Sequence, residues 1–137
     1  MMHCAVFPMH TLENYKFVVV LSFMDGQCVL SRHRARTTWE TQGGHIEPGE
    51  TPLEAAKREL WEESGATAYS IEPLCDYRVT GDDGCANGVV FRAEITALGP
   101  LPESEMEAVR RFSTLPENLT YPEITPILFA RALEQNK

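Results

Sequence analysis

Alternating apolar and polar positions predict several β-strands along the chain. Residues 16–34, KFVVVLSFMDGQCVLSRHR, contain two runs of β-branched and other apolar residues on either side of Asp25-Gly26. This dipeptide favours a tight turn, so the segment is expected to form a β-hairpin. The next turn is expected at 81–84, GDDG. Further strands are expected from Trp39 into Gly43-Gly44, over 66–80 as one or two strands, over 88–95 and over 108–112.

Two segments show helical spacing instead. The first is 52–64, where Thr51 to Glu54 form a capping box with Pro52 at the first helical position, and Gly65 suits the left-handed residue that ends a helix. The second is 123–135. In the first helix, the residues expected to share the face that packs on the core are Leu53, Ala56, Leu60 and Ser64.

Strands combined with two helices predict an α/β fold with a mixed sheet covered on its faces. The 137 residues fit one domain, 1–137. The net charge of −8, without a run of Lys or Arg, argues against a nucleic-acid surface. The longest apolar stretch, 17–24, is too short to span a membrane.

The four cysteines contain no CxxC pair that would indicate a zinc site. We interpret them as reduced thiols of a cytoplasmic protein. The first ten residues also lack the basic start and long apolar run of a signal peptide.

Three glutamates, Glu59, Glu62 and Glu63, crowd the last turns of the first helix. Glu59 and Glu63 repel each other as an i,i+4 pair, and all three lie near the negative end of the helix dipole. Arg58 alone cannot balance three anions. A solvated acidic face is the simpler interpretation, but carboxylates at this spacing converge on one point beside the helix. That arrangement suits a hard divalent cation, Mg²⁺ or Mn²⁺.

These residues belong to a longer pattern. Gly44, then Glu50, then RELWEESGA at 58–66 occupy every fixed position of the Nudix box, so the chain resembles the Nudix hydrolases. A weaker resemblance to the nucleoside triphosphatases of that family comes from two further segments, a WE..GG lead-in at 39–44 and FSTLPENL at 112–119. One departure is Gln42, where such proteins usually have Pro. The resemblance implies a Nudix-type mixed sheet sandwiched between helices.

The resemblance also implies roles for residues in the box. Glu59, Glu62 and Glu63 would be metal ligands, and one of them, or an acidic residue from a later loop, would orient or deprotonate the attacking water. Arg58 would hold a glutamate through a bidentate pair, unless it makes only a surface pair with Glu62. Glu50 would support the loop or the surroundings of the metal. Gly43 and Gly44 would let the backbone approach the site closely.

Residues outside the box are less constrained. Among Glu103, Glu105 and Glu107, we favour Glu107 as the later acidic residue. At strand spacing Arg32, Arg34 and Arg36 would face one side and contact phosphate, although an exposed strand face is equally compatible. His33 and His45 are expected to be bystanders, and Trp39 to be structural. The aromatic candidates for stacking on a base are Phe23, Tyr77, Phe91 and Tyr121.

The favoured function is a Mg²⁺-dependent enzyme that cleaves a nucleoside triphosphate, with a purine or damaged purine base, to the monophosphate and pyrophosphate. The partner is therefore a small nucleotide. Alternatives are hydrolysis of ADP-ribose, a nucleotide sugar or a dinucleoside polyphosphate, an isoprenoid diphosphate isomerase, and a non-catalytic nucleotide-sensing module. The sequence leaves the base and the oligomeric state open.

Overall fold

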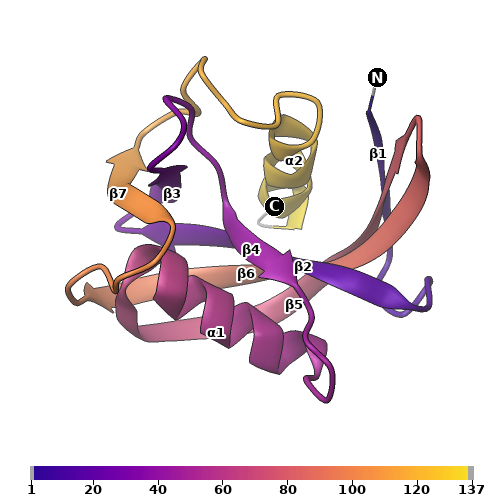
Figure 1. Cartoon of the computed structure of the whole chain (residues 1–137), viewed down its shortest axis with the longest axis horizontal. Coiled ribbons are helices and arrows are strands. Elements are labelled where there is room, and N and C mark those ends of the chain that lie inside the picture. Colours follow the sequence, from indigo (N-terminus) through magenta and orange to yellow (C-terminus); the bar gives the residue numbers. More distant parts are fainter. Residues whose placement is uncertain (1, 136–137) are drawn as a thin grey trace.

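The computed structural model describes residues 2–135, and its centre is one seven-stranded mixed sheet (Figure 1). The strand order is β1-β5-β6-β2-β3-β7, and β4 pairs with the first half of β2. The β2–β6 pair is parallel, while the other pairs are antiparallel. The strands are β1 His3–Phe7, β2 Tyr15–Met24, β3 Gln27–His33, β4 Gln42–His45, β5 Ala66–Gly81, β6 Gly84–Leu98 and β7 Met106–Phe112.

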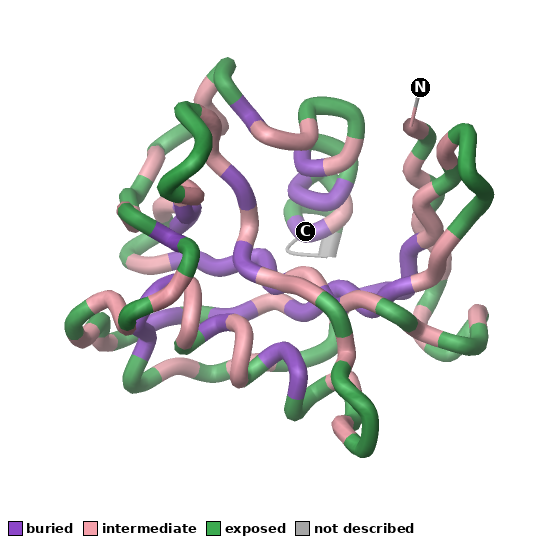
Figure 2. Tube along the Cα trace, viewed as in Figure 1, coloured by how far each residue is buried: buried purple, intermediate pink, exposed green. Residues whose placement is uncertain are grey.

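Two helices, α1 Pro52–Ser64 and α2 Thr125–Gln135, lie on opposite faces of the sheet (Figure 1). Each helix covers its own apolar core. Ala56 and Leu60 of α1 pack with Val18 and Val89, while Leu128 of α2 packs in a second cluster on the other face. Figure 2 shows the buried residues along the central strands and on the inner sides of both helices. The predicted α/β sandwich is therefore confirmed.

Local signals located several elements well. The helix α1 begins and ends where its capping box and Gly65 predict, and Gly65 adopts the left-handed conformation with φ 78°. The hairpin of β2 and β3 turns at Asp25 and Gly26, with φ values of 52° and 79°. The strand β1 was not expected, because its five residues carry little pattern of their own and pair only with the distant β5. Trp39 lies before β4, and its backbone pairs with Leu119 in an isolated bridge instead of starting a strand.

The predicted core face of α1 is wrong at Leu53. This side chain is 39% exposed, whereas Ala55 is fully buried. Ala55 lies on the same side of the helix as Glu59 and Glu63. The helix is therefore rolled toward its acidic side, and two small alanines allow it to lie close to the sheet.

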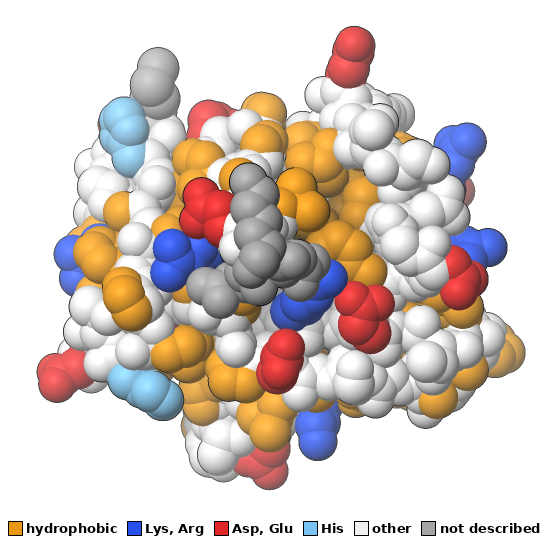
Figure 3. Space-filling view, turned by 180° about the vertical axis from the view of Figure 1, so that it is seen from behind, with side chains coloured by type: hydrophobic (Ala, Val, Ile, Leu, Met, Phe, Trp, Pro, Cys, Tyr) orange, Lys and Arg blue, Asp and Glu red, His pale blue; other side chains and the backbone are white. Residues whose placement is uncertain are grey.

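The surface carries mixed charges. On the face seen in Figure 3, acidic and basic side chains are interspersed among apolar ones without one continuous basic area. Among the described residues, no helix has the length and apolar character needed to cross a membrane. All four cysteines are free, and Cys28 and Cys75 are buried.

Gly43 lies where β4 runs against β2, and a Cβ there would overlap the carbonyl oxygen of Val18. We expect Gly43→Ala to lower the free energy of unfolding by about 2 kcal/mol, as for an overpacked site. Urea denaturation measures this change. Gly81→Ala is the matched control, because the nearest neighbour of its added Cβ is Met2 Cγ at 3.9 Å. An equal loss of stability in both variants would contradict the close approach of β4 to β2.

Candidate functional site

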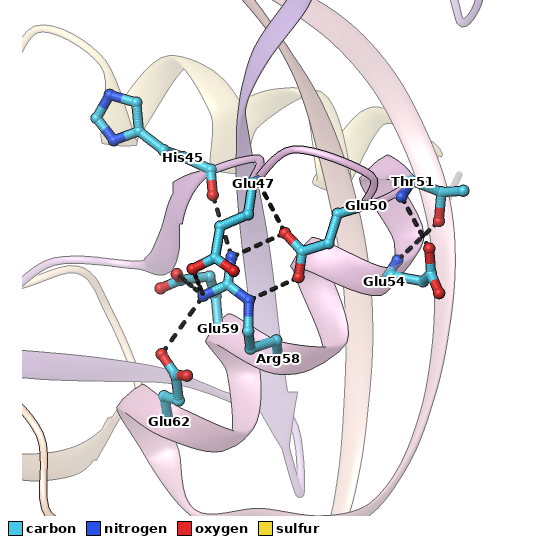
Figure 4. A network of polar contacts seen from close by, with 8 residues as sticks. All are labelled: His45, Glu47, Glu50, Thr51, Glu54, Arg58, Glu59 and Glu62. Carbon is cyan, nitrogen blue, oxygen red and sulfur yellow. Dashed lines mark hydrogen bonds and ion pairs between the residues drawn. The ribbon is translucent and has the colours of Figure 1, made fainter.

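Arg58 lies at the centre of a network of carboxylates (Figure 4). Its Nε donates to Glu50 Oε2 at 2.7 Å and one Nη donates to Glu50 Oε1 at 2.9 Å, which makes a bidentate pair. The same Nη donates to the backbone oxygen of His45 at 3.1 Å. The bonds from Arg58, and then the backbone N–H of Glu47, lower the pKa of Glu50 to about 2. Arg58 therefore ties α1 to the loop that precedes it.

The second Nη of Arg58 faces the other acidic groups. It donates to Glu59, and it lies 3.5 Å from Glu62 and 3.8 Å from Glu47. The side chain of Glu62 is 41% exposed. The i,i+4 pair with Glu62 is thus the looser contact, while the bidentate partner of Arg58 is Glu50.

Glu63 and Glu59 turn toward the glycine pair of β4. The amide of Gly43 donates to Glu63 Oε1 at 2.8 Å. The carboxylate of Glu59 packs on Gly44, where an added Cβ would lie only 2.9 Å from it. Because a side chain on Gly44 would displace Glu59, both glycines allow close approach of the carboxylates.

Burial dominates the electrostatics of these two groups. It raises the pKa of Glu63 to about 8, against the lowering effect of the Gly43 amide, and the neighbouring Glu59, Glu40 and Glu62 raise it further. Burial also raises the pKa of Glu59, although Arg58 opposes that shift. A nearby cation would reverse both effects, because opposite charge favours the ionised carboxylate.

The donor set therefore suits a hard divalent cation in its chemistry, as carboxylates at i, i+3 and i+4 do. Its members are not gathered around one point in this arrangement. Within residues 2–135, no three acidic, His or Cys side chains are placed to hold a metal ion together. Glu59 faces Arg58, and Glu63 faces the Gly43 amide. Joint binding of a cation requires these side chains to turn, with Glu59 leaving Arg58.

A cavity of about 370 Å³ lies on the α2 side of the sheet, directly beside Gly43 and Gly44. This volume falls within the range of small-molecule sites. Its wall is apolar and aromatic, with a few polar groups. The lining residues used below are Phe17, Glu40, His45, Tyr77, Tyr121 and Leu128.

Two of the aromatic candidates, Tyr77 and Tyr121, line this cavity. Phe91 is buried in the core under α1, and Phe23 packs edge-on against Phe129 of α2. His45, expected to be a bystander, also lines the cavity. Its ring packs edge-on against that of Phe17, with 4.7 Å between the ring centroids. Trp39 packs against Phe112, as expected of a structural residue.

Glu40 is a candidate that the sequence reasoning did not single out. Its side chain is nearly buried and lines the cavity, and its Oε1 accepts from Arg36 at 2.9 Å and from Thr120 at 3.1 Å. It is also close enough to raise the pKa of Glu63. The WE..GG lead-in was the signal that could have pointed to it. Glu40 therefore lies between the cavity and the acidic end of α1.

The expectation that three arginines face one side is wrong, because β3 ends at His33. Arg32 lies 3.8 Å from Glu107 and over the ring of Trp39, while Arg34 donates to the backbone oxygen of Ser104. Of the three arginines, only Arg36 hydrogen-bonds a residue of the cavity wall.

Glu107 lies on β7 and is 54% exposed. In the part of the chain that the structure describes, no hydrogen bond or ion pair joins it to the glutamates of α1. Its catalytic role therefore stays a prediction.

Comparison with known proteins shows which family the sequence matches. The NUDIX domain model matches residues 14–126. A Bacillus subtilis protein, YtkD, whose name assigns it 8-oxo-dGTP diphosphatase activity, is 35% identical over 109 residues, which are 79% of this chain and 68% of YtkD. An RNA pyrophosphohydrolase of Psychrobacter is 40% identical over 56 residues, 41% of this chain and 32% of that protein.

Solved structures agree with the sequence comparisons. The pyrophosphohydrolase BsRppH of Bacillus subtilis, crystallised as an E68A mutant, superposes with a TM-score of 0.80 at 27% identity. The match covers 98% of this chain and 90% of the BsRppH chain. An ADP-ribose pyrophosphatase of Streptococcus suis has a TM-score of 0.70 at 18% identity, covering 88% of this chain and 90% of its own. The second comparison shows the fold alone.

The raised pKa of Glu63 predicts how the metal-free protein responds to pH. Between the ordinary pKa near 4.5 and about 8, the folded state holds a proton that the unfolded state has lost. The free energy of unfolding should therefore fall as pH rises through this window. Urea denaturation in EDTA measures it, and Glu63→Gln should flatten the slope. The same slope in the variant and the wild type would contradict burial of the Glu63 carboxylate.

Proposed function

The chain belongs to the Nudix hydrolase family, and we propose that its pyrophosphohydrolase activity acts on a nucleoside triphosphate, releasing the monophosphate and pyrophosphate with Mg²⁺ bound. The base is a purine, with a damaged purine included. Mn²⁺ is expected to substitute for Mg²⁺ because both are bound by oxygen ligands.

The observation that carries this proposal is the position of the cavity. It adjoins Gly43 and Gly44 on the α2 side, and the same two glycines contact Glu63 and Glu59 on the α1 side. A nucleoside placed between Tyr77 and Tyr121 would extend its phosphates past the glycine pair toward the carboxylates. One ligand would thus span the cavity and the acidic end of α1.

The chemistry is divided among the residues already described. The bound cation would neutralise phosphate oxygens and acidify the attacking water. Glu59, Glu62 and Glu63 would hold that cation. The bidentate pair of Arg58 and Glu50 would keep the helix and its preceding loop in place while Glu59 turns toward the metal. Arg36, whose side chain is 43% exposed and bonds Glu40 of the cavity wall, would be the first of the three arginines to meet a phosphate.

The volume of the cavity and the relatives support a triphosphate over the larger alternatives. About 370 Å³ is near the lower end for small-molecule sites and suits one nucleoside rather than two. YtkD is named for a reaction on a nucleoside triphosphate. RNA pyrophosphohydrolases among the relatives favour a second candidate, the triphosphate end of an RNA. The net charge of −8 counts against binding of the polyanionic RNA chain that follows this triphosphate end.

A substrate panel with product analysis tests the proposal. It contains dGTP, 8-oxo-dGTP, ATP, ADP-ribose, a dinucleoside tetraphosphate and a short 5′-triphosphate RNA, each with Mg²⁺ or EDTA. We expect monophosphate and pyrophosphate from a mononucleotide, with no turnover in EDTA. If kcat/KM for any other substrate class is about a hundredfold higher, a difference of roughly 2.7 kcal/mol in transition-state binding, the substrate assignment is wrong.

Glu59→Gln and Glu63→Gln should each lower kcat at least about a hundredfold, because each removes charge from the groups that hold the cation. Both variants should fold, since loss of a like charge relieves repulsion. Glu54→Gln is the control on the same helix, because glutamine at this position preserves the capping box. Turnover near that of the wild type in either test variant, at saturating Mg²⁺, would refute the ligand assignment.

A further inference from the structure

A chain of buried hydrogen bonds crosses the sheet and ends on α1. Ser22 Oγ of β2 donates to Gln42 Oε1 at 2.6 Å, and Gln42 Nε2 of β4 donates to Ser31 Oγ of β3 at 2.9 Å. Ser31 Oγ then donates to the backbone oxygen of Glu63 at 2.7 Å. Ser22, Ser31 and Gln42 are each fully buried. Three strands are therefore joined through side chains to the last turn of the helix.

The direction of this chain is determined by its surroundings. Gln42 Nε2 also donates to the backbone oxygen of Val29 at 3.2 Å. A flipped amide would place Oε1 against that carbonyl oxygen, so the flip is excluded. Ser31 has one hydroxyl proton, and Glu63 accepts it, so Ser31 must accept from Gln42. Each bond polarises the next, which makes such a buried chain cooperative.

Residues 42 and 43 hold Glu63 at two points. The side chain of Gln42 reaches the backbone of Glu63 through Ser31, and the backbone amide of Gly43 binds the Glu63 carboxylate. The backbone oxygen of Glu63 is one of the terminal helix carbonyls that lack a partner within the helix. Ser31 supplies that partner. The carboxylate of Glu63 is thus hydrogen-bonded to β4 directly, and its backbone oxygen is connected to β4 through Ser31.

We propose that Gln42 is a positioning residue, which acts through Ser31 to fix the end of α1 so that the Glu63 carboxylate is presented to the divalent cation. This inference rests on the proposed function, because it assigns Glu63 to that cation.

Two serines provide a matched pair of variants. Ser31→Ala and Ser22→Ala each remove one fully buried hydroxyl that bonds Gln42, but only Ser31 contacts Glu63. Gln42→Met removes the amide at nearly constant volume. Mn²⁺ binding is measured by calorimetry without substrate, and hydrogen exchange of the Gly43 amide is measured in the same variants. Melting temperatures report the general loss of stability.

Ser31→Ala and Gln42→Met should weaken Mn²⁺ binding at least about tenfold, the scale for residues that orient metal ligands. They should also speed exchange at the Gly43 amide. Ser22→Ala should lose stability but keep Mn²⁺ binding within about twofold of the wild type, because the bonds from Gln42 to Ser31 and from Ser31 to Glu63 remain. If Gln42→Met does not fold, the comparison of the two serine variants still decides.

Equal Mn²⁺ binding by the two serine variants would overturn the inference. Two results separate it from the proposed function. A wild-type protein that binds Mn²⁺ and cleaves a triphosphate, with Ser31→Ala unchanged in both respects, refutes the positioning role alone. A wild-type protein that binds no Mn²⁺ refutes the metal-dependent function and the positioning role with it.

Discussion

The hydrogen bond from the Gly43 amide to Glu63 determines how α1 lies against the sheet. For this bond to form, the helix must turn its acidic side toward β4. That orientation places Ala55 and Ala56, rather than Leu53, in the core. It also requires a strand without side chains opposite the carboxylates, which Gly43 and Gly44 provide. The composition of both elements follows from this one contact.

The same orientation leaves the metal-free site electrostatically costly. Two carboxylates lose much of their hydration, and their raised pKa values express that loss. Arg58 offsets part of this cost at Glu59. However, its two bonds to Glu50 are made with the loop before α1 and not with the carboxylates in the last turns of the helix. Functional sites commonly retain such local conflicts, because the arrangement that stabilises the free protein differs from the one that binds a ligand.

Elements with strong local signals could be predicted from the sequence. The bounds of α1 depended on its caps, and the β2–β3 turn depended on Asp25-Gly26, so neither needed knowledge of distant partners. The strand β1 and the roll of α1 depend on pairing and packing between remote segments, which a single sequence does not reveal. The end of β3 at His33 separated Arg36 from Arg32 for the same reason. The Nudix box identified the carboxylates, but the bidentate partner of Arg58 emerged only in three dimensions.

The wall of the cavity and the acidic helix α1 come from different stretches of the chain. The acidic end of α1 lies within residues 59–63. The cavity wall is built from other elements: Phe17 belongs to β2, Tyr77 to β5, Leu128 to α2 and Tyr121 to the segment that leads into α2. They meet at Gly43 and Gly44. If the cavity holds the base, as proposed, substitutions in its wall can change the preference for a base without altering the box. In that case a change of substrate would require no change in the carboxylates of α1.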